Sequence, residues 1–269
     1  MTALRPMALA SVLVLGCESV DGGLGSTKEE GALQGTAVGG DLRWPAVGYL
    51  AARYSESAYC TATLLAPRVA VTSLACVRAH DVGQGYFGLG WPKDALRDGA
   101  SSRVPVAHVV EEASAVDDDD TRLAYVLLGE TALTPERMGV RYARASSARA
   151  TSRRCDLTVV GYGNRDVDGY GYAPSRRLST SVCDEGRLEG ETSERIDVQS
   201  VHGTLCHVDG DFGAALLRTT DDDRPTLVGL FVGEVVYAGA PCTETRATYV
   251  DAAAHFAFIE EALAAGARY

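Results

Sequence analysis

The stretch CHVDGDFGAALL, residues 206–217, governs how the rest of the chain is interpreted. In it, Gly210 and Asp211 precede an aromatic residue, Phe212, and Gly213 follows. A phenyl ring has no lone pair with which to attack a carbonyl carbon and no proton to give up. Phe212 therefore cannot serve as a nucleophile in acyl transfer.

A second stretch, CTATLLAPRVAVTSLAC at residues 60–76, holds two short runs of apolar and β-branched residues between two cysteines. Such runs predict two neighbouring strands, and a disulfide between Cys60 and Cys76 would staple them into a hairpin. Ala75 stands directly before the second cysteine. Its methyl group cannot accept a proton, so this position offers no general base.

Both stretches resemble blocks of the trypsin-like (chymotrypsin-fold, S1-type) serine proteases, Gly-Asp-Ser-Gly-Gly-Pro and Val-Leu-Thr-Ala-Ala-His-Cys. Further matches follow in the family's order over about residues 36–265. The resemblance implies an all-β fold of two antiparallel β-barrels with a C-terminal α-helix. It assigns the first barrel to residues 36–141, and the second barrel with the helix to residues 142–265.

The end of the chain, ATYVDAAAHFAFIEEAL, resembles the closing strand and C-terminal helix of that family. Phe256, Ile259 and Leu263 recur at helical spacing, which predicts an amphipathic helix docked by that face. We expect His255, just before the helix, to be a surface or packing residue.

In the family, a Ser, a His and an Asp form the catalytic triad. The resemblance places Phe212 at the Ser position and Ala75 at the His position. In the segment TRLAYVLLGE it places Arg122 at the Asp position, which Asp120 reaches only through a shift of two residues. The Arg122 side chain either points to solvent or lies in the cleft. We do not expect His80 to replace the missing base, because it lies in the following loop.

The resemblance also implies which residues surround the site. Gly210 and Asp211 match the loop that forms the oxyanion hole. The substrate-pocket positions are Thr204, Val232, Gly233 and Glu234. The last three replace Ser-Trp-Gly, and Thr204 replaces the Asp of trypsin, so cleavage after Lys or Arg is not implied.

The family begins its mature domain with a segment similar to AVGG at residues 37–40, preceded by a basic residue. Here Gly35 and Thr36 precede it, so cleavage of the trypsin type is not expected. Without a new N-terminal ammonium group, Asp211 needs another partner, or the loop around it stays loose.

The chain has seven cysteines. Setting aside Cys17 leaves six, an even number that suits three disulfides in an oxidising compartment. The family pattern pairs Cys60 with Cys76 and Cys206 with Cys242, and exclusion leaves Cys155 for Cys183.

Residues 1–16 combine Arg5 with the apolar run from Met7 to Leu15, which predicts a secretory signal peptide. VLGC, ending at Cys17, resembles a bacterial lipobox and implies acylation of that cysteine; the alternative is an ordinary signal peptide with an incidental cysteine. Residues 17–35 predict a flexible tether. We expect an exported, lipid-anchored protein of the bacterial envelope, at the outer membrane because Glu18 is not Asp.

The chain has 269 residues and a net charge of −11, which argues against nucleic acid or anionic lipid as its ligand. The acidic runs at residues 117–120 and 221–223 lack the alternating spacing of a calcium loop. We expect no cofactor and no metal, and a monomer that binds protein or peptide.

Three functions stay open at this stage. The first is a catalytically dead serine protease homologue acting as a protein-binding module, in which the Phe212 ring fills the space vacated at Ala75. The second is a serine-type endopeptidase with a non-standard site. The third is a structural envelope lipoprotein. The replaced triad favours the first.

Overall fold

The computed structural model describes residues 36–37, 46–55, 57–90, 103–113, 121–129, 141–149, 155–163, 178–184, 193–201, 205, 207, 210–218, 224–233 and 244–269. Several residues singled out above lie outside these ranges, namely Cys17, Asp120, Thr204, Cys206, Glu234 and Cys242, together with both acidic runs. No helix within these ranges has the length and apolar character needed to cross a membrane.

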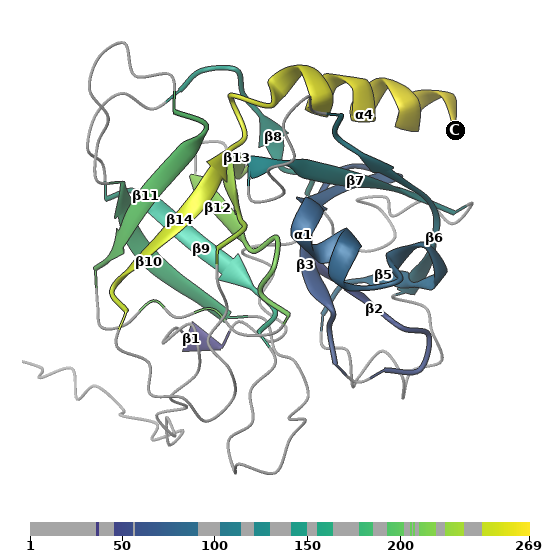
Figure 1. The fold of residues 1–269 in the computed structure, drawn as a ribbon, viewed down its shortest axis with the longest axis horizontal. Coiled ribbons are helices and arrows are strands. Elements are labelled where there is room, and N and C mark those ends of the chain that lie inside the picture. Colours follow the sequence, from purple (N-terminus) through teal and green to yellow (C-terminus); the bar gives the residue numbers. More distant parts are fainter. Residues whose placement is uncertain are drawn as a thin grey trace, which may run out of the picture.

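Six antiparallel strands close the first barrel (Figure 1). They are β2 (Val47–Ala51), β3 (Cys60–Ala66), β4 (Val69–Ser73), β5 (Tyr86–Gly88), β6 (Arg103–Glu111) and β7 (Leu123–Leu128). Their spatial order is β2-β3-β4-β7-β6-β5. The short helix α1 (Leu74–Ala79) directly follows β4, and a 3₁₀ turn, η1 (Val82–Gln84), precedes β5.

Six further antiparallel strands form the second barrel. They are β9 (Leu157–Gly161), β10 (Leu178–Asp184), β11 (Arg195–Ser200), β12 (Ala215–Arg218), β13 (Thr226–Phe231) and β14 (Arg246–Asp251). The pairings run β9-β10-β11-β14-β13-β12 and return to β9, which closes the ring. Two short strands lie on its outside: β1 (Thr36–Ala37) on β10, and β8 (Arg144–Ala145) on β13. The expected fold class is confirmed.

Alternation along the strands divides the apolar side chains between two environments. In β7, Val126 and Leu128 face the interior of the first barrel, in one cluster with Leu64 and Phe87. The alternate residues of β7 belong to a second cluster that joins both barrels and the C-terminal helix. A shared core therefore holds the two barrels together.

The helix α4 (Phe256–Arg268) follows the second barrel but packs on strands β3, β4 and β7 of the first, where Figure 1 shows it running beside β7. Its buried residues are Phe258, Ile259 and Ala262, and Leu263 is half-buried against the same core. The predicted face was therefore right at Ile259 and Leu263, whereas Phe256 is only half-buried. The small residues let the helix approach closely, and a Cβ at Gly266 would collide with the Val69 side chain.

Two disulfides lie within the described residues. Cys60 bonds to Cys76 and thereby links β3 to α1. Cys155 bonds to Cys183 and links the start of β9 to its neighbour β10. These are the pairs that the sequence led us to expect.

Candidate functional site

Phe212 lies in a tight turn that leads into β12. The Ala214 amide donates a 2.7 Å hydrogen bond to the Asp211 carbonyl oxygen and closes the turn. The Gly213 amide donates to the Phe231 carbonyl oxygen at 2.9 Å, which ties the turn to β13. Gly210 and Gly213 have φ angles of 94° and 76°, in the region that favours glycine. The residues flanking Phe212 thus fit a backbone that few other side chains tolerate.

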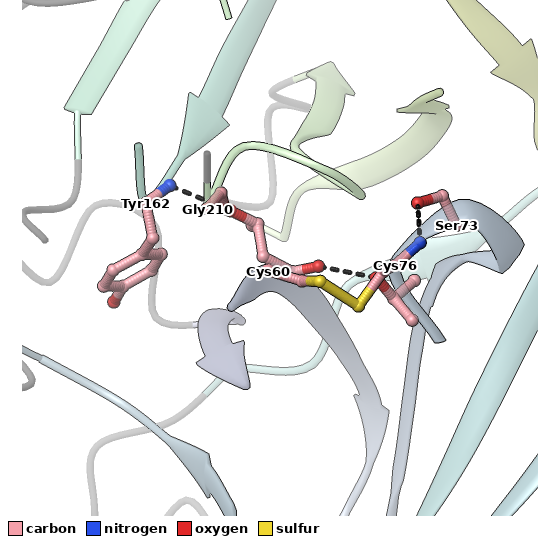
Figure 2. The surroundings of a disulfide bond; sticks show 7 residues. Cys60, Ser73, Cys76, Tyr162 and Gly210 are labelled. Atoms are coloured by element: carbon pink, nitrogen blue, oxygen red, sulfur yellow. Dashed lines mark hydrogen bonds between the residues drawn. A yellow bond between two sulfur atoms is a disulfide. The ribbon is translucent and has the colours of Figure 1, made fainter. Parts of the chain in front are cut away.

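Thr61 of β3 holds this turn against the first barrel. Its amide donates a 2.9 Å hydrogen bond to the Phe212 carbonyl oxygen. Its hydroxyl donates to the Gly210 carbonyl oxygen at 2.9 Å and accepts from the Tyr162 amide at 2.8 Å. Figure 2 shows Gly210 and Tyr162 side by side next to the Cys60–Cys76 disulfide. One buried threonine therefore joins β3 to two segments of the second barrel.

The approach between turn and barrel is close. A Cβ at Gly213 would collide with the Thr61 carbonyl oxygen and the Thr72 hydroxyl, and would lie 3.2 Å from the Ser73 amide nitrogen. The Thr72 hydroxyl donates to the Thr61 carbonyl oxygen at 2.8 Å. Only glycine fits at position 213.

Ala75 lies in α1, directly before the cysteine that bonds to Cys60. The helix begins after Ser73, whose hydroxyl accepts a hydrogen bond from the Cys76 amide at 3.4 Å (Figure 2). Ser73 is fully buried, and its hydroxyl caps the first turn of the helix. Ala75 itself is half-buried.

The Phe212 side chain is half-buried and packs against the apolar cluster of the first barrel, the one that contains Cys60 and Cys76. Its ring centroid lies 6.5 Å from that of Phe231, with the two rings tilted by 31°. The benzyl group thus lies against protein on both sides of the junction between the barrels.

Arg122 immediately precedes β7, and its carbonyl oxygen accepts from the Leu74 amide at the start of α1. Its side chain is only 8% exposed, so it does not point to solvent. The guanidinium Nη1 donates to the Glu112 carbonyl oxygen at 3.4 Å. Pairing of β7 with β4 draws Arg122 inward beside the end of β6.

His255 is buried at the start of α4, so of the two expected roles the surface one is excluded and the packing one fits. Its Nδ1 lies 2.8 Å from both carboxylate oxygens of Glu112. The same carboxylate accepts from the Leu123 amide at 3.1 Å. The sequence carries no signal for this pair, because its members are separated by 143 positions and belong to different halves of the chain.

Sequence reasoning also missed His207, which stands three residues before Gly210. Its ring stacks on Phe231 with 3.6 Å between centroids, and its Nε2 lies 2.8 Å from the Tyr249 hydroxyl. Complete burial lowers the pKa of His207 from 6.5 to about 3. Burial, and secondarily the charge of Asp211, raises the pKa of Tyr249. His207 is therefore neutral at pH 7, and its Nε2 shares a hydrogen bond with the Tyr249 hydroxyl.

The remaining site residues fall as follows. His80 ends α1, and its ring stacks on Tyr59 at 4.8 Å. Val232 is buried and Gly233 is half-buried, with the Phe231 ring 3.1 Å from where a Cβ of Gly233 would lie. Within the described ranges, no group of three His, Cys, Asp or Glu side chains is placed to hold a metal ion.

Among solved structures, the chain is similar to human heparin binding protein. The match has a TM-score of 0.60 and 15% sequence identity, and it covers 84% of this chain and 94% of the other. The chain has the trypsin-like fold. No protein-family model and no curated protein sequence matches it.

The three residues that the sequence resemblance matched to the triad lie on both sides of the junction between the barrels. Ala75 and Arg122 belong to the first barrel, where the Leu74 amide bonds to the Arg122 carbonyl oxygen. Phe212 belongs to the second and reaches the first through Thr61. These three residues carry a methyl, a guanidinium and a benzyl group, none of which is a nucleophile or a general base for acyl transfer.

Proposed function

We propose that this chain is a trypsin-like serine protease homologue without hydrolytic activity that acts as a protein-binding module. The observation that carries the proposal is the benzyl side chain of Phe212 on a turn that is hydrogen-bonded to the first barrel. Loss of nucleophile and base together removes rate acceleration of about 10⁶-fold. What is left is a folded surface that can recognise protein without cutting it.

Other side chains near the turn are already engaged. The Thr61 hydroxyl bonds on two sides and the Ser73 hydroxyl caps α1. His207 is buried and bonded to Tyr249, and His255 is buried and paired with Glu112. None of these groups offers an accessible nucleophile with a neighbouring base.

The space at the former triad supports the same proposal. Ala75 is smaller than the imidazole of an active protease, and the Phe212 ring packs against the cluster that contains the neighbouring Cys76. Relative to an active protease, alanine in place of histidine removes volume and phenylalanine in place of serine adds it. Such compensating changes in volume preserve packing. The paired substitutions favour a junction stabilised by packing.

We propose that the ligand is protein or peptide, bound by a monomer. The name of the similar human protein states that it binds heparin, a polyanion. With 25 basic and 36 acidic residues, this chain would repel a polyanion. We therefore transfer the fold and not the ligand.

We further propose export to the bacterial envelope and lipid anchoring at Cys17, on the strength of the lipobox-like sequence. Metabolic labelling with an alkyne fatty acid tests this: the native chain should take up label, and Cys17→Ser should lose it. If the native chain takes up no label, the proposed lipid anchor is contradicted and the N-terminal segment is an ordinary signal peptide.

Labelling with a fluorophosphonate probe, with casein hydrolysis as a second readout, tests the loss of activity. The purified native chain should not react above background, and trypsin provides the positive control. A label on the native chain that disappears when one serine is changed to alanine would establish an endopeptidase instead.

Binding can be tested by cross-linking and pull-down from envelope extract with three forms of the chain. The native protein and Tyr54→Asp, altered at a side chain that is 77% exposed, should retain the same partner. Phe212→Asp should lose it. The absence of any reproducible partner would favour a structural envelope role.

A further inference from the structure

The turn from Gly210 to Ala214 contains a fully buried acid, Asp211. Thr36 and Ala37 lie in β1, which pairs with β10. No basic residue directly precedes Ala37, so cleavage there and a new ammonium group for Asp211 are not expected. Nevertheless the turn is closed, tied to β13 and tied to β3.

The Thr61 side chain supplies contacts that a residue without a hydroxyl group would not. Its hydroxyl uses both functions, donating to the Gly210 carbonyl oxygen and accepting from the Tyr162 amide. Both partners belong to the second barrel, and all three residues are buried. A buried amide or carbonyl that loses its partner has no water to replace it.

We propose that Thr61 is the positioning residue that holds the Phe212 turn against the first barrel in the uncleaved chain. The hydroxyl fixes the backbone at Gly210, the Thr61 amide fixes it at Phe212, and Gly213 seats in the space between Thr61 and Thr72. The turn has one conformation from the moment of folding, with no processing step. This inference concerns only the backbone of the turn, so its test does not depend on the proposed binding role.

The chain offers a matched control in the same strand. Thr63, two residues along β3, is also fully buried, and its hydroxyl has no hydrogen-bond partner among the described residues. Thr61→Val and Thr63→Val each replace one buried hydroxyl by a methyl group of the same shape. Thr61→Ser retains the hydroxyl and removes only a methyl group.

Hydrogen exchange of the full exported chain, followed by mass spectrometry, tests the proposal. The segments of interest are residues 210–217 and 158–163, on the two sides of the Thr61 hydroxyl, and α4 is the reference. Thr61→Val should exchange about tenfold faster or more in both segments with α4 unchanged. Thr61→Ser and Thr63→Val should match the native chain, whose intact mass should retain the Thr36–Ala37 bond.

Three results would overturn the proposal. In the first, Thr61→Val exchanges as slowly as Thr63→Val. In the second, the serine variant fails to restore slow exchange. The third needs no variant and covers the case in which Thr61→Val does not fold: in the native chain, residues 210–217 already exchange within seconds, or the bond before Ala37 is cut.

Discussion

The imidazole of His255 and the carboxylate of Glu112 meet at 2.8 Å and join the start of the C-terminal helix to the end of β6. The side chains are 7% and 17% exposed, so water screens the pair only weakly. The contact lies beside Arg122 and links the first barrel to the last element of the chain.

Glu112→Gln should lower the free energy of unfolding by about 2–3 kcal/mol, because it weakens a buried ionic hydrogen bond. Glu111→Gln is the matched control, since Glu111 pairs with Arg78 at a site where both side chains are well exposed. That change should cost no more than about 0.5 kcal/mol. Urea denaturation at pH 7 measures both, and equal midpoints would contradict a stabilising role for the pair.

His207 should make stability depend on pH. Its pKa in the folded chain is about 3, below the ordinary 6.5, so only the unfolded chain binds a proton between these values. Its contribution is complete above pH 6.5. Below that, the free energy of unfolding should fall by about 1.4 kcal/mol per pH unit until pH nears 3.

His207→Gln carries no titrating group, so its free energy of unfolding should depend less steeply on pH by that amount. Urea denaturation at pH 6.5, 5.5 and 4.5 provides the comparison. The carboxylates titrate in both proteins and cancel in the difference. Parallel curves for the native and variant chains would show that His207 is already charged when buried, or is exposed.

Gly213→Ala should destabilise the chain by about 2–4 kcal/mol, because a methyl group would collide with Thr61 and Thr72. Gly90→Ala is the control. Gly90 has a φ of 77°, close to the 76° of Gly213, but no described atom lies within 4 Å of its Cβ position. Backbone strain alone should cost it about 1–2 kcal/mol. Thermal unfolding measures both, and similar losses would show that the turn is not seated tightly.

Phe212→Ser should remain unlabelled by a fluorophosphonate, because Ala75 cannot take the proton from the new hydroxyl. Ala75→His with Phe212→Ser should be labelled above background, since base and nucleophile would then occupy the positions that the sequence resemblance assigns to them. The label is read by gel fluorescence. Labelling of the single variant would reveal a base that the described residues do not suggest.

Much of the fold could be predicted from the sequence, because strand alternation, the cysteine spacing and the order of motifs all point to two barrels. The helix face was predicted correctly only in part. Spacing correctly selected Ile259 and Leu263, but the helix also buries Phe258 and Ala262, while Phe256 is only half-buried. The phase of a helix depends on the surface that it meets.

The site was predictable where a residue acts through its own chemistry, as at Phe212 and Ala75. It was not predictable where long-range contacts decide the outcome. Arg122 is buried because β7 pairs with β4, and His207 is neutral because Phe231 and Tyr249 enclose it. Such environments arise only after the barrels have closed.

The helix α4 has a consequence for synthesis. The ring centroids of Phe258 and Tyr125 lie 5.2 Å apart, so the outer side of the first barrel is covered by a helix that is synthesised after the strands of both barrels. Until α4 has been made, the first barrel exposes the apolar surface that α4 later covers. A nascent chain of this kind is a natural client for holding chaperones, and its first barrel is completed only once α4 has formed.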